Sequence, residues 1–200
     1  MVNHEAIVNA ITGRSKEIYD WAGHRVRELI TLKYPPDTRI LDVGAGQGKY
    51  RALLPEYEYV YAVEVFEPYV RDNKLEELYH RVYTQDVREF ADAYGYSLLT
   101  GMVVVMGDVL EHLTRDEAKH VLHEFRRYVQ EIIVVVPYEY PQGEEDGNVH
   151  QEHLQDDLTV ELMAKHYPEL TLLEVEVRDH RPFKGIYRWR RECQQLAGSD

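Results

Sequence analysis

The chain has 200 residues, of which 44% are hydrophobic and 30% charged, a balance typical of one soluble globular domain with a substantial core. Lys and Arg number 23 against 36 Asp and Glu, a formal net charge of −13, which argues against a nucleic-acid-binding protein because phosphate contacts need clustered cations. No apolar run reaches the roughly 20 residues of a membrane span, and no secretory signal pattern is present. The single cysteine, Cys193, favours a reducing compartment, so we expect a cytoplasmic protein.

The first segment, residues 4–32, is predicted to be helical. Its apolar residues recur at spacings of three, four and seven, as one stripe of Ile7, Ile11, Ile18, Ala22, Val26 and Leu29. Two consecutive prolines end the segment. We therefore expect an N-terminal helical cap over residues 1–36, a main domain over residues 37–192 and a polar tail over residues 193–200.

A glycine-rich turn follows a short apolar strand and precedes a helix. It reads Asp42-Val-Gly-Ala-Gly-Gln-Gly48, and glycines in such a turn let backbone approach a ligand beside a helix N-terminus. A phosphate-binding P-loop would need glycine at Val43 and Ser or Thr at Tyr50. The dinucleotide fingerprint would need its third glycine at Lys49. The pattern present is instead D-x-G-x-G-x-G.

Acidic residues follow the next two predicted strands. A strand over residues 59–63 leads into Glu64, which comes 20 residues after Gly44. At that distance dinucleotide sites place a carboxylate that accepts hydrogen bonds from ribose hydroxyls. A shorter strand over residues 81–83 precedes Asp86, which is equally compatible with an N-cap of the following helix.

A fourth apolar strand, residues 101–106, precedes a cluster of polar residues. Asp108, Glu111 and His112 follow it, and the carboxyl ends of parallel strands frame ligand crevices in α/β sheets. We therefore expect these three side chains at the site.

A fifth strand over residues 131–136 is followed by a long acidic loop, and loops of this length are often functional. The loop leads to His150 and His153, which could bind a metal with nearby acids. The spacing is not H-E-x-x-H and no cysteine assists, so we favour a substrate-loop or structural role and expect no metal site. Strands over residues 170–177 and 185–189 then close the chain as an antiparallel hairpin.

The glycine turn, Glu64, Asp86, the segment Asp108-Val-Leu-Glu-His112 and the closing hairpin together resemble the class I S-adenosylmethionine-dependent methyltransferases of the small-molecule type. The resemblance covers about residues 38–190. It implies an α/β fold with a three-layer, Rossmann-like sheet of seven strands, mostly parallel with a C-terminal antiparallel hairpin. It also implies S-adenosylmethionine as cofactor and a small-molecule methyl acceptor, methylated on O, N or C by in-line displacement.

The resemblance further implies the residues of the site. Cofactor contacts fall on Asp42, Gly44, Ala45, Gly46, Gly48, Glu64, Val65, Asp86, Val87, Asp108 and Val109. Acceptor contacts fall on Glu111 and His112. Apart from the resemblance, the acidic loop with Tyr138 and Tyr140 indicates a polar or cationic acceptor, so these two tyrosines are also expected to contact it. Histidine is the natural general base near neutral pH, and the candidates are His112 first, then His150 and His153.

Alternatives stay open at this point. His112 could pack beside the cofactor without taking a proton. A non-catalytic S-adenosylmethionine-binding module and a nicotinamide-dependent oxidoreductase are the other two classes. The oligomeric state is not predicted.

Overall fold

The apolar runs of the sequence form one seven-stranded sheet in the computed structural model, which describes residues 20–145 and 147–192. The strand order is β3-β2-β1-β4-β5-β7-β6. The bounds are β1 Ile40–Val43, β2 Val60–Val63, β3 Arg81–Tyr83, β4 Val103–Gly107, β5 Glu131–Pro137, β6 Thr171–Arg178 and β7 Arg181–Arg190. Strands β1 to β5 are parallel, and β7 runs antiparallel to both β5 and β6. The predicted fold class, including the closing hairpin, is confirmed.

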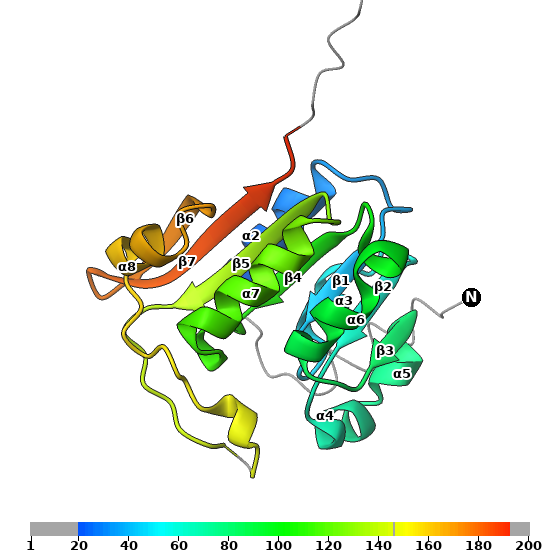
Figure 1. Ribbon diagram of the computed structural model, residues 1–200, viewed down its shortest axis with the longest axis horizontal. Coiled ribbons are helices and arrows are strands. Elements are labelled where there is room, and N and C mark those ends of the chain that lie inside the picture. Colours follow the sequence, from blue (N-terminus) through cyan, green and yellow to red (C-terminus); the bar gives the residue numbers. More distant parts are fainter. Residues whose placement is uncertain (1–19, 146, 193–200) are drawn as a thin grey trace, which may run out of the picture.

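Helices cover both faces of this sheet (Figure 1). Their bounds are α2 Trp21–Thr31, α3 Lys49–Leu53, α4 Glu67–Asp72, α5 Leu75–Leu78, α6 Val87–Leu99, α7 Arg115–Arg126 and α8 Val160–His166. Helices α6 and α7 lie on the near face in Figure 1, and α2 lies on the far face. None of these helices has the length and hydrophobicity needed to cross a bilayer.

The strands have two apolar faces because successive side chains point to opposite sides of a sheet. In β5, Ile132 and Val134 join the core that includes α6 and α7. Ile133 and Val135 join the opposite core, which includes α2. Burial on both faces explains why β4 and β5 read as continuous apolar runs.

The local signals for helices agree with the structure where it describes them. Thr114 caps α7 in a capping box with Glu117, in which each side chain accepts from the other residue's backbone N–H. Of the predicted N-terminal helix, the structure describes α2, whose Ala22, Val26 and Ile30 are fully buried. Its earlier part, with Ile7, Ile11 and Ile18, lies outside the described residues.

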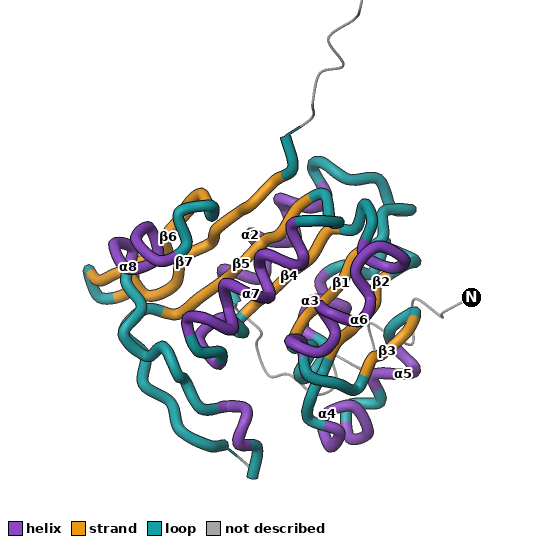
Figure 2. Tube along the Cα trace, in the orientation of Figure 1, coloured by secondary structure: helices purple, strands orange, loops and turns teal. Residues whose placement is uncertain are grey.

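The long loop between β5 and α8 extends beyond the ends of the strands (Figure 2). Together with the turns after β1, β2, β3 and β4, it surrounds the carboxyl edge of the parallel strands. Two short 3-10 helices, η1 Leu110–His112 and η2 Val149–Gln151, lie in this region. Candidate site residues are therefore brought to one edge of the sheet.

Candidate active site

The glycine turn after β1 is held by a carboxylate at the end of β2. Gly44, Gly46 and Gly48 have φ of 68°, 52° and 85°, a left-handed conformation that residues with a Cβ rarely adopt. Glu64 Oε2 accepts the Gly46 N–H at 2.7 Å, and its Oε1 accepts the Phe66 N–H at 2.8 Å. Glu64 thus fixes the turn, while its remaining lone pairs stay available for a ligand.

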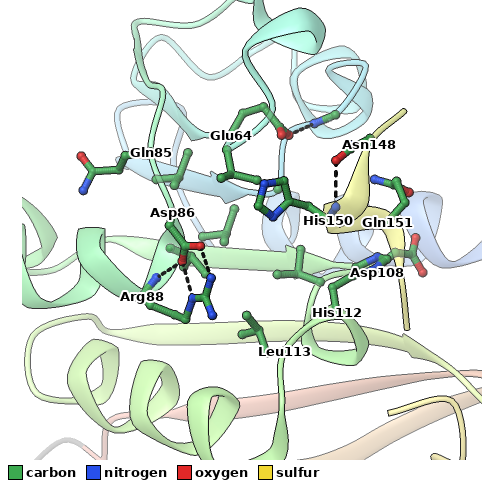
Figure 3. Close-up of a pocket in the computed structure, with 17 residues that line it drawn as sticks. Glu64, Gln85, Asp86, Arg88, Asp108, His112, Leu113, Asn148, His150 and Gln151 are labelled. Atoms are coloured by element: carbon green, nitrogen blue, oxygen red, sulfur yellow. Dashed lines mark hydrogen bonds and ion pairs between the residues drawn. The ribbon is translucent and has the colours of Figure 1, made fainter. Parts of the chain in front are cut away.

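A pocket opens between this turn and η2, and we call it the glycine pocket (Figure 3). Its predicted lining residues are Gly44, Gly46, Glu64, Val65, Asp86, Val87, Asp108, Val109, His112 and His150. Lining residues that the sequence analysis missed are Val43, Val63, Gln85, Arg88, Leu113, Asn148 and Gln151. All of the missed residues except Asn148 directly adjoin a predicted one, so nearness in the sequence to a predicted residue was the available signal.

Asp86 has two roles at this pocket. It is the N-cap of α6, and its Oδ1 accepts the Arg88 backbone N–H at 2.8 Å. The Arg88 guanidinium also binds this carboxylate and reaches Glu117. Burial opposes ionisation of Asp86, but the Arg88 contacts hold its pKa below the ordinary value. The N-cap interpretation and the site interpretation are therefore compatible.

Asp42, Ala45 and Gly48 do not line the glycine pocket but lie behind it. Asp42 is 1% exposed, and the Tyr79 hydroxyl donates to its Oδ2 at 2.5 Å. Its Oδ1 has no donor among the described residues. Burial raises the pKa of Asp42 to about 7, although the bond from Tyr79 opposes the shift. Asp42 is therefore a buried carboxyl group near the end of β1, bonded to Tyr79.

The Asp42→Asn variant is expected to change how stability depends on pH. Between about pH 4 and pH 7 the unfolded carboxyl ionises while the folded one keeps its proton, so wild-type stability falls as pH rises through this window. Asparagine keeps the acceptor for Tyr79 without ionising, and should be more stable than wild type at pH 8 by about 2–4 kcal/mol. Urea denaturation at pH 4 and pH 8 measures the difference. Equal pH dependence in the two proteins would contradict this assignment.

A chain of alternating charges crosses the carboxyl edge of the sheet. Asp108, at φ 59° just after β4, accepts from Lys49 Nζ at 3.1 Å and from Lys184 Nζ at 2.7 Å. Lys49 also binds Asp20, just before α2, at 2.9 Å. Burial alone would raise the pKa of Asp108, but the two ammonium groups hold it below the ordinary value. We call this Asp20–Lys49–Asp108–Lys184 series the charge chain.

A second pocket lies beside the glycine pocket, and we call it the histidine pocket. It is lined by Asp108, Glu111, His112, Pro137, Tyr140, Gln142, Gln151, His153, Phe183 and Lys184. The His112 and His153 rings are 4.7 Å apart between centroids. Burial lowers the pKa of His112, which favours its neutral form. Asp108, His112 and Gln151 line both pockets, so the two pockets meet at the end of β4.

The three candidate histidines do not form one group. His112 and His153 line the histidine pocket, whereas His150 lines the glycine pocket, near Glu64 in Figure 3. His150 and His153 reach different pockets because η2 ends at Gln151 and the chain then turns toward η1. After this turn, the His153 N–H donates to the Gln142 carbonyl and the Leu154 N–H donates to the Glu111 carbonyl.

Tyr138 is a correction to the expected acceptor contacts. It is 5% exposed, and its hydroxyl pairs with that of Tyr187 at 2.6 Å, so it lines neither pocket. The reason is strand alternation: its N–H still bonds the Phe183 carbonyl beyond β5, so its side chain joins the same core as Val136. Tyr140, two residues on, is 45% exposed and lines the histidine pocket.

Comparison with known proteins gives the class of fold. No protein-family model and no curated protein sequence matches the chain. A solved S-adenosylmethionine-dependent methyltransferase from Clostridium acetobutylicum is similar in structure, with a TM-score of 0.61 and 12% identity over 93% of this chain and 96% of that one. Magnesium protoporphyrin IX methyltransferase from Synechocystis, with bound S-adenosylmethionine, gives 0.56 and 14% over 94% and 90%.

The N-terminal domain of EvdMO1, with bound S-adenosylhomocysteine, gives a TM-score of 0.59 and 16% identity over 89% of this chain and 82% of that one. At such low identities the likeness concerns architecture. The chain has the α/β fold of class I S-adenosylmethionine-dependent methyltransferases.

Proposed function

We propose that this chain is an S-adenosylmethionine-dependent methyltransferase acting on a small molecule. The observation that carries the proposal is the meeting of two pockets at the carboxyl end of β4. The glycine pocket contains the glycine turn, whose backbone is held by the Glu64 carboxylate at the end of β2. The histidine pocket contains His112 and His153. Similar structures with bound S-adenosylmethionine or S-adenosylhomocysteine support the choice of cofactor.

In this proposal the cofactor occupies the glycine pocket. Glu64 accepts the ribose hydroxyls, because a carboxylate has acceptor sites beyond the two that the backbone uses. Asp86 and the backbone of Val87 contact adenine; Val87 is the first residue of α6, where backbone N–H groups have no partner within the helix. His150 closes the pocket on the side of η2.

The acceptor occupies the histidine pocket, which places it against the methyl end of the cofactor near Asp108 and His112. Holding the acceptor in line with the methyl–sulfur bond supplies much of the rate. Bound S-adenosylmethionine would supply a methyl group on a positively charged sulfur; the acceptor would take this methyl group, and the electron pair of the broken carbon–sulfur bond would stay on sulfur as a neutral thioether. The acceptor proton passes to His112, whose neutral form has a lone pair to take it.

The chemistry of the pocket suggests the kind of acceptor. Lys184, Gln142 and Gln151 supply hydrogen-bond donors, and Tyr140 and Phe183 supply aromatic surface. This combination suits a small polar molecule with a hydroxyl or amine. The formal net charge of −13 supports the same choice over a nucleic acid.

Calorimetric titration tests the cofactor assignment. S-adenosylmethionine and S-adenosylhomocysteine are expected to bind one site with a dissociation constant of about 1–100 µM, whereas NADH should give no heat of binding. Binding of NADH alone would favour an oxidoreductase. Binding without formation of S-adenosylhomocysteine from any small-metabolite fraction would favour a non-catalytic module.

A further inference from the structure

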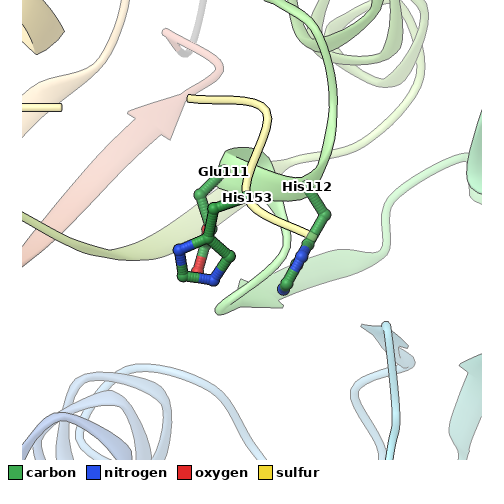
Figure 4. A group of neighbouring side chains, drawn as sticks. All are labelled: Glu111, His112 and His153. Atoms are coloured by element: carbon green, nitrogen blue, oxygen red, sulfur yellow. The ribbon is translucent and has the colours of Figure 1, made fainter. Parts of the chain in front are cut away.

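Three potential metal ligands converge in the histidine pocket (Figure 4). Glu111 and His112 belong to η1, and His153 comes from the loop that follows η2. Each offers one ligand atom, and these atoms all lie within 4.8 Å of one another. The sequence pattern places His150 beside His153 and favours no metal site, whereas the structure brings His153 together with Glu111 and His112.

Glu111 lacks the partners that a buried carboxyl group normally has. It is 0% exposed, and neither side-chain oxygen has a hydrogen-bond donor among the described residues. The nearby ammonium groups of Lys49 and Lys184 bind Asp108 instead. Glu111 is therefore a buried carboxyl group with no compensating partner among the described residues. Such a group is costly unless a cation or donor compensates it.

The two imidazoles are held in the orientation of metal-binding histidines. His112 Nδ1 lies 3.1 Å from the Glu152 carbonyl oxygen, and His153 Nδ1 lies 2.6 Å from that of Tyr140. A carbonyl oxygen only accepts, so Nδ1 of each ring carries the proton and the neutral ring has its lone pair on Nε2. Backbone carbonyls commonly fix histidine ligands in this way.

The loop that carries the second histidine is anchored to η1. The N–H groups of Leu154 and Gln155 donate to the Glu111 carbonyl at 2.8 and 3.0 Å. The Gln155 amide donates to the carbonyls of Leu110 and Leu113 at 2.8 and 2.9 Å. These bonds preorganise the cluster across a sequence separation of about forty residues, and preorganised ligands favour binding.

We propose that Glu111, His112 and His153 bind one divalent transition-metal ion. Two nitrogens and one carboxylate suit Zn²⁺ and its first-row neighbours rather than Mg²⁺ or Ca²⁺, which prefer oxygen ligands. Three protein ligands leave coordination positions for water or an acceptor oxygen in the histidine pocket.

Binding of a metal ion at this site does not depend on the proposed methyltransferase function. A role of the ion in methyl transfer does rest on that proposed function. A bound metal lowers the pKa of a coordinated hydroxyl. With the metal bound, the Nε2 lone pair of His112 is a ligand and takes no proton, so the acceptor proton leaves to solvent water. The base role of His112 then belongs to the metal-free protein.

The test is titration of untagged, chelator-treated protein with Co²⁺, followed by its visible absorption, and with Zn²⁺ by calorimetry. One equivalent is expected to bind with a dissociation constant of about 1 µM or lower. Glu111→Gln and His153→Ala should each weaken binding at least about 100-fold. His123→Gln is the matched control because its side chain is 70% exposed on α7, and it should bind as wild type does.

Absence of stoichiometric binding by the wild-type protein would overturn the proposal, as would equal affinity in Glu111→Gln, His153→Ala and wild type. Circular dichroism and S-adenosylhomocysteine titration of each variant separate loss of the metal site from loss of the fold or cofactor pocket. Metal binding in a protein that binds no S-adenosylhomocysteine would refute the proposed function while leaving the metal site intact.

Discussion

Replacing Glu64 with alanine is expected to weaken S-adenosylhomocysteine binding by at least about 100-fold, since two or more hydrogen bonds to a charged group are lost at about 1.5–3 kcal/mol each. The substitution removes the proposed acceptor for the ribose hydroxyls. It also releases the N–H groups of Gly46 and Phe66, which the carboxylate holds at 2.7 and 2.8 Å. Calorimetric titration of the variant measures the effect.

Two further variants sharpen this experiment. Glu64→Gln keeps the size of the side chain but replaces one acceptor oxygen with an NH₂ group, so it should also bind weakly. Glu67→Ala removes an exposed carboxylate at the start of α4 and should bind as wild type does. Affinity within a few-fold of wild type in Glu64→Ala would show that the ribose does not use this carboxylate.

Replacing Asp108 with asparagine is expected to destabilise the fold by about 2–3 kcal/mol, because two ammonium groups lose their shared anion. The side chains of Lys49, Lys184 and Asp108 are 25%, 18% and 30% exposed, so solvent screens part of the loss. Asparagine tolerates the positive φ of position 108, which confines the change to charge. Urea denaturation at neutral pH measures it.

A double variant and a control complete the design. In Asp108→Asn, Lys49 keeps its ion pair with Asp20, whereas Lys184 loses the pair with Asp108. Adding Lys184→Met removes that cation and should recover part of the lost stability, a coupling that distant sites would not show. Arg71→Ala breaks an ion pair with 62% and 63% exposed side chains and should leave the denaturation midpoint unchanged. Equal midpoints for Asp108→Asn and wild type would show that the charge chain contributes nothing to stability.

The sequence predicted the central strands of the sheet well because these strands are buried on both faces. Each such strand has to be apolar throughout, and β4 and β5 are fully buried. The three alternating glycines likewise correspond to three residues with positive φ. These are local requirements, so they leave a local pattern.

The residues that line the histidine pocket could not be predicted from a local sequence pattern. His150 and His153 are three residues apart, yet they line different pockets. Which pocket each reaches depends on bonds from this part of the loop to Glu111, about forty residues earlier in the chain, and to Gln142 in the same loop. No spacing rule encodes such contacts. Tyr138 is different, because continuing the alternation of β5 by two residues would have placed it in the core.

The position of β7 has a consequence for the order in which the molecule folds. This strand lies between β5 and β6, although β6 precedes it in the chain. The β6–β7 hairpin can pair locally, but until β7 docks against β5, β5 presents an open edge, the kind of surface that drives aggregation. Lys184 arrives with β7, so Asp108 and the histidine pocket are completed only in this non-local, late step. Ligand binding should therefore appear in refolding kinetics after most of the secondary structure has formed.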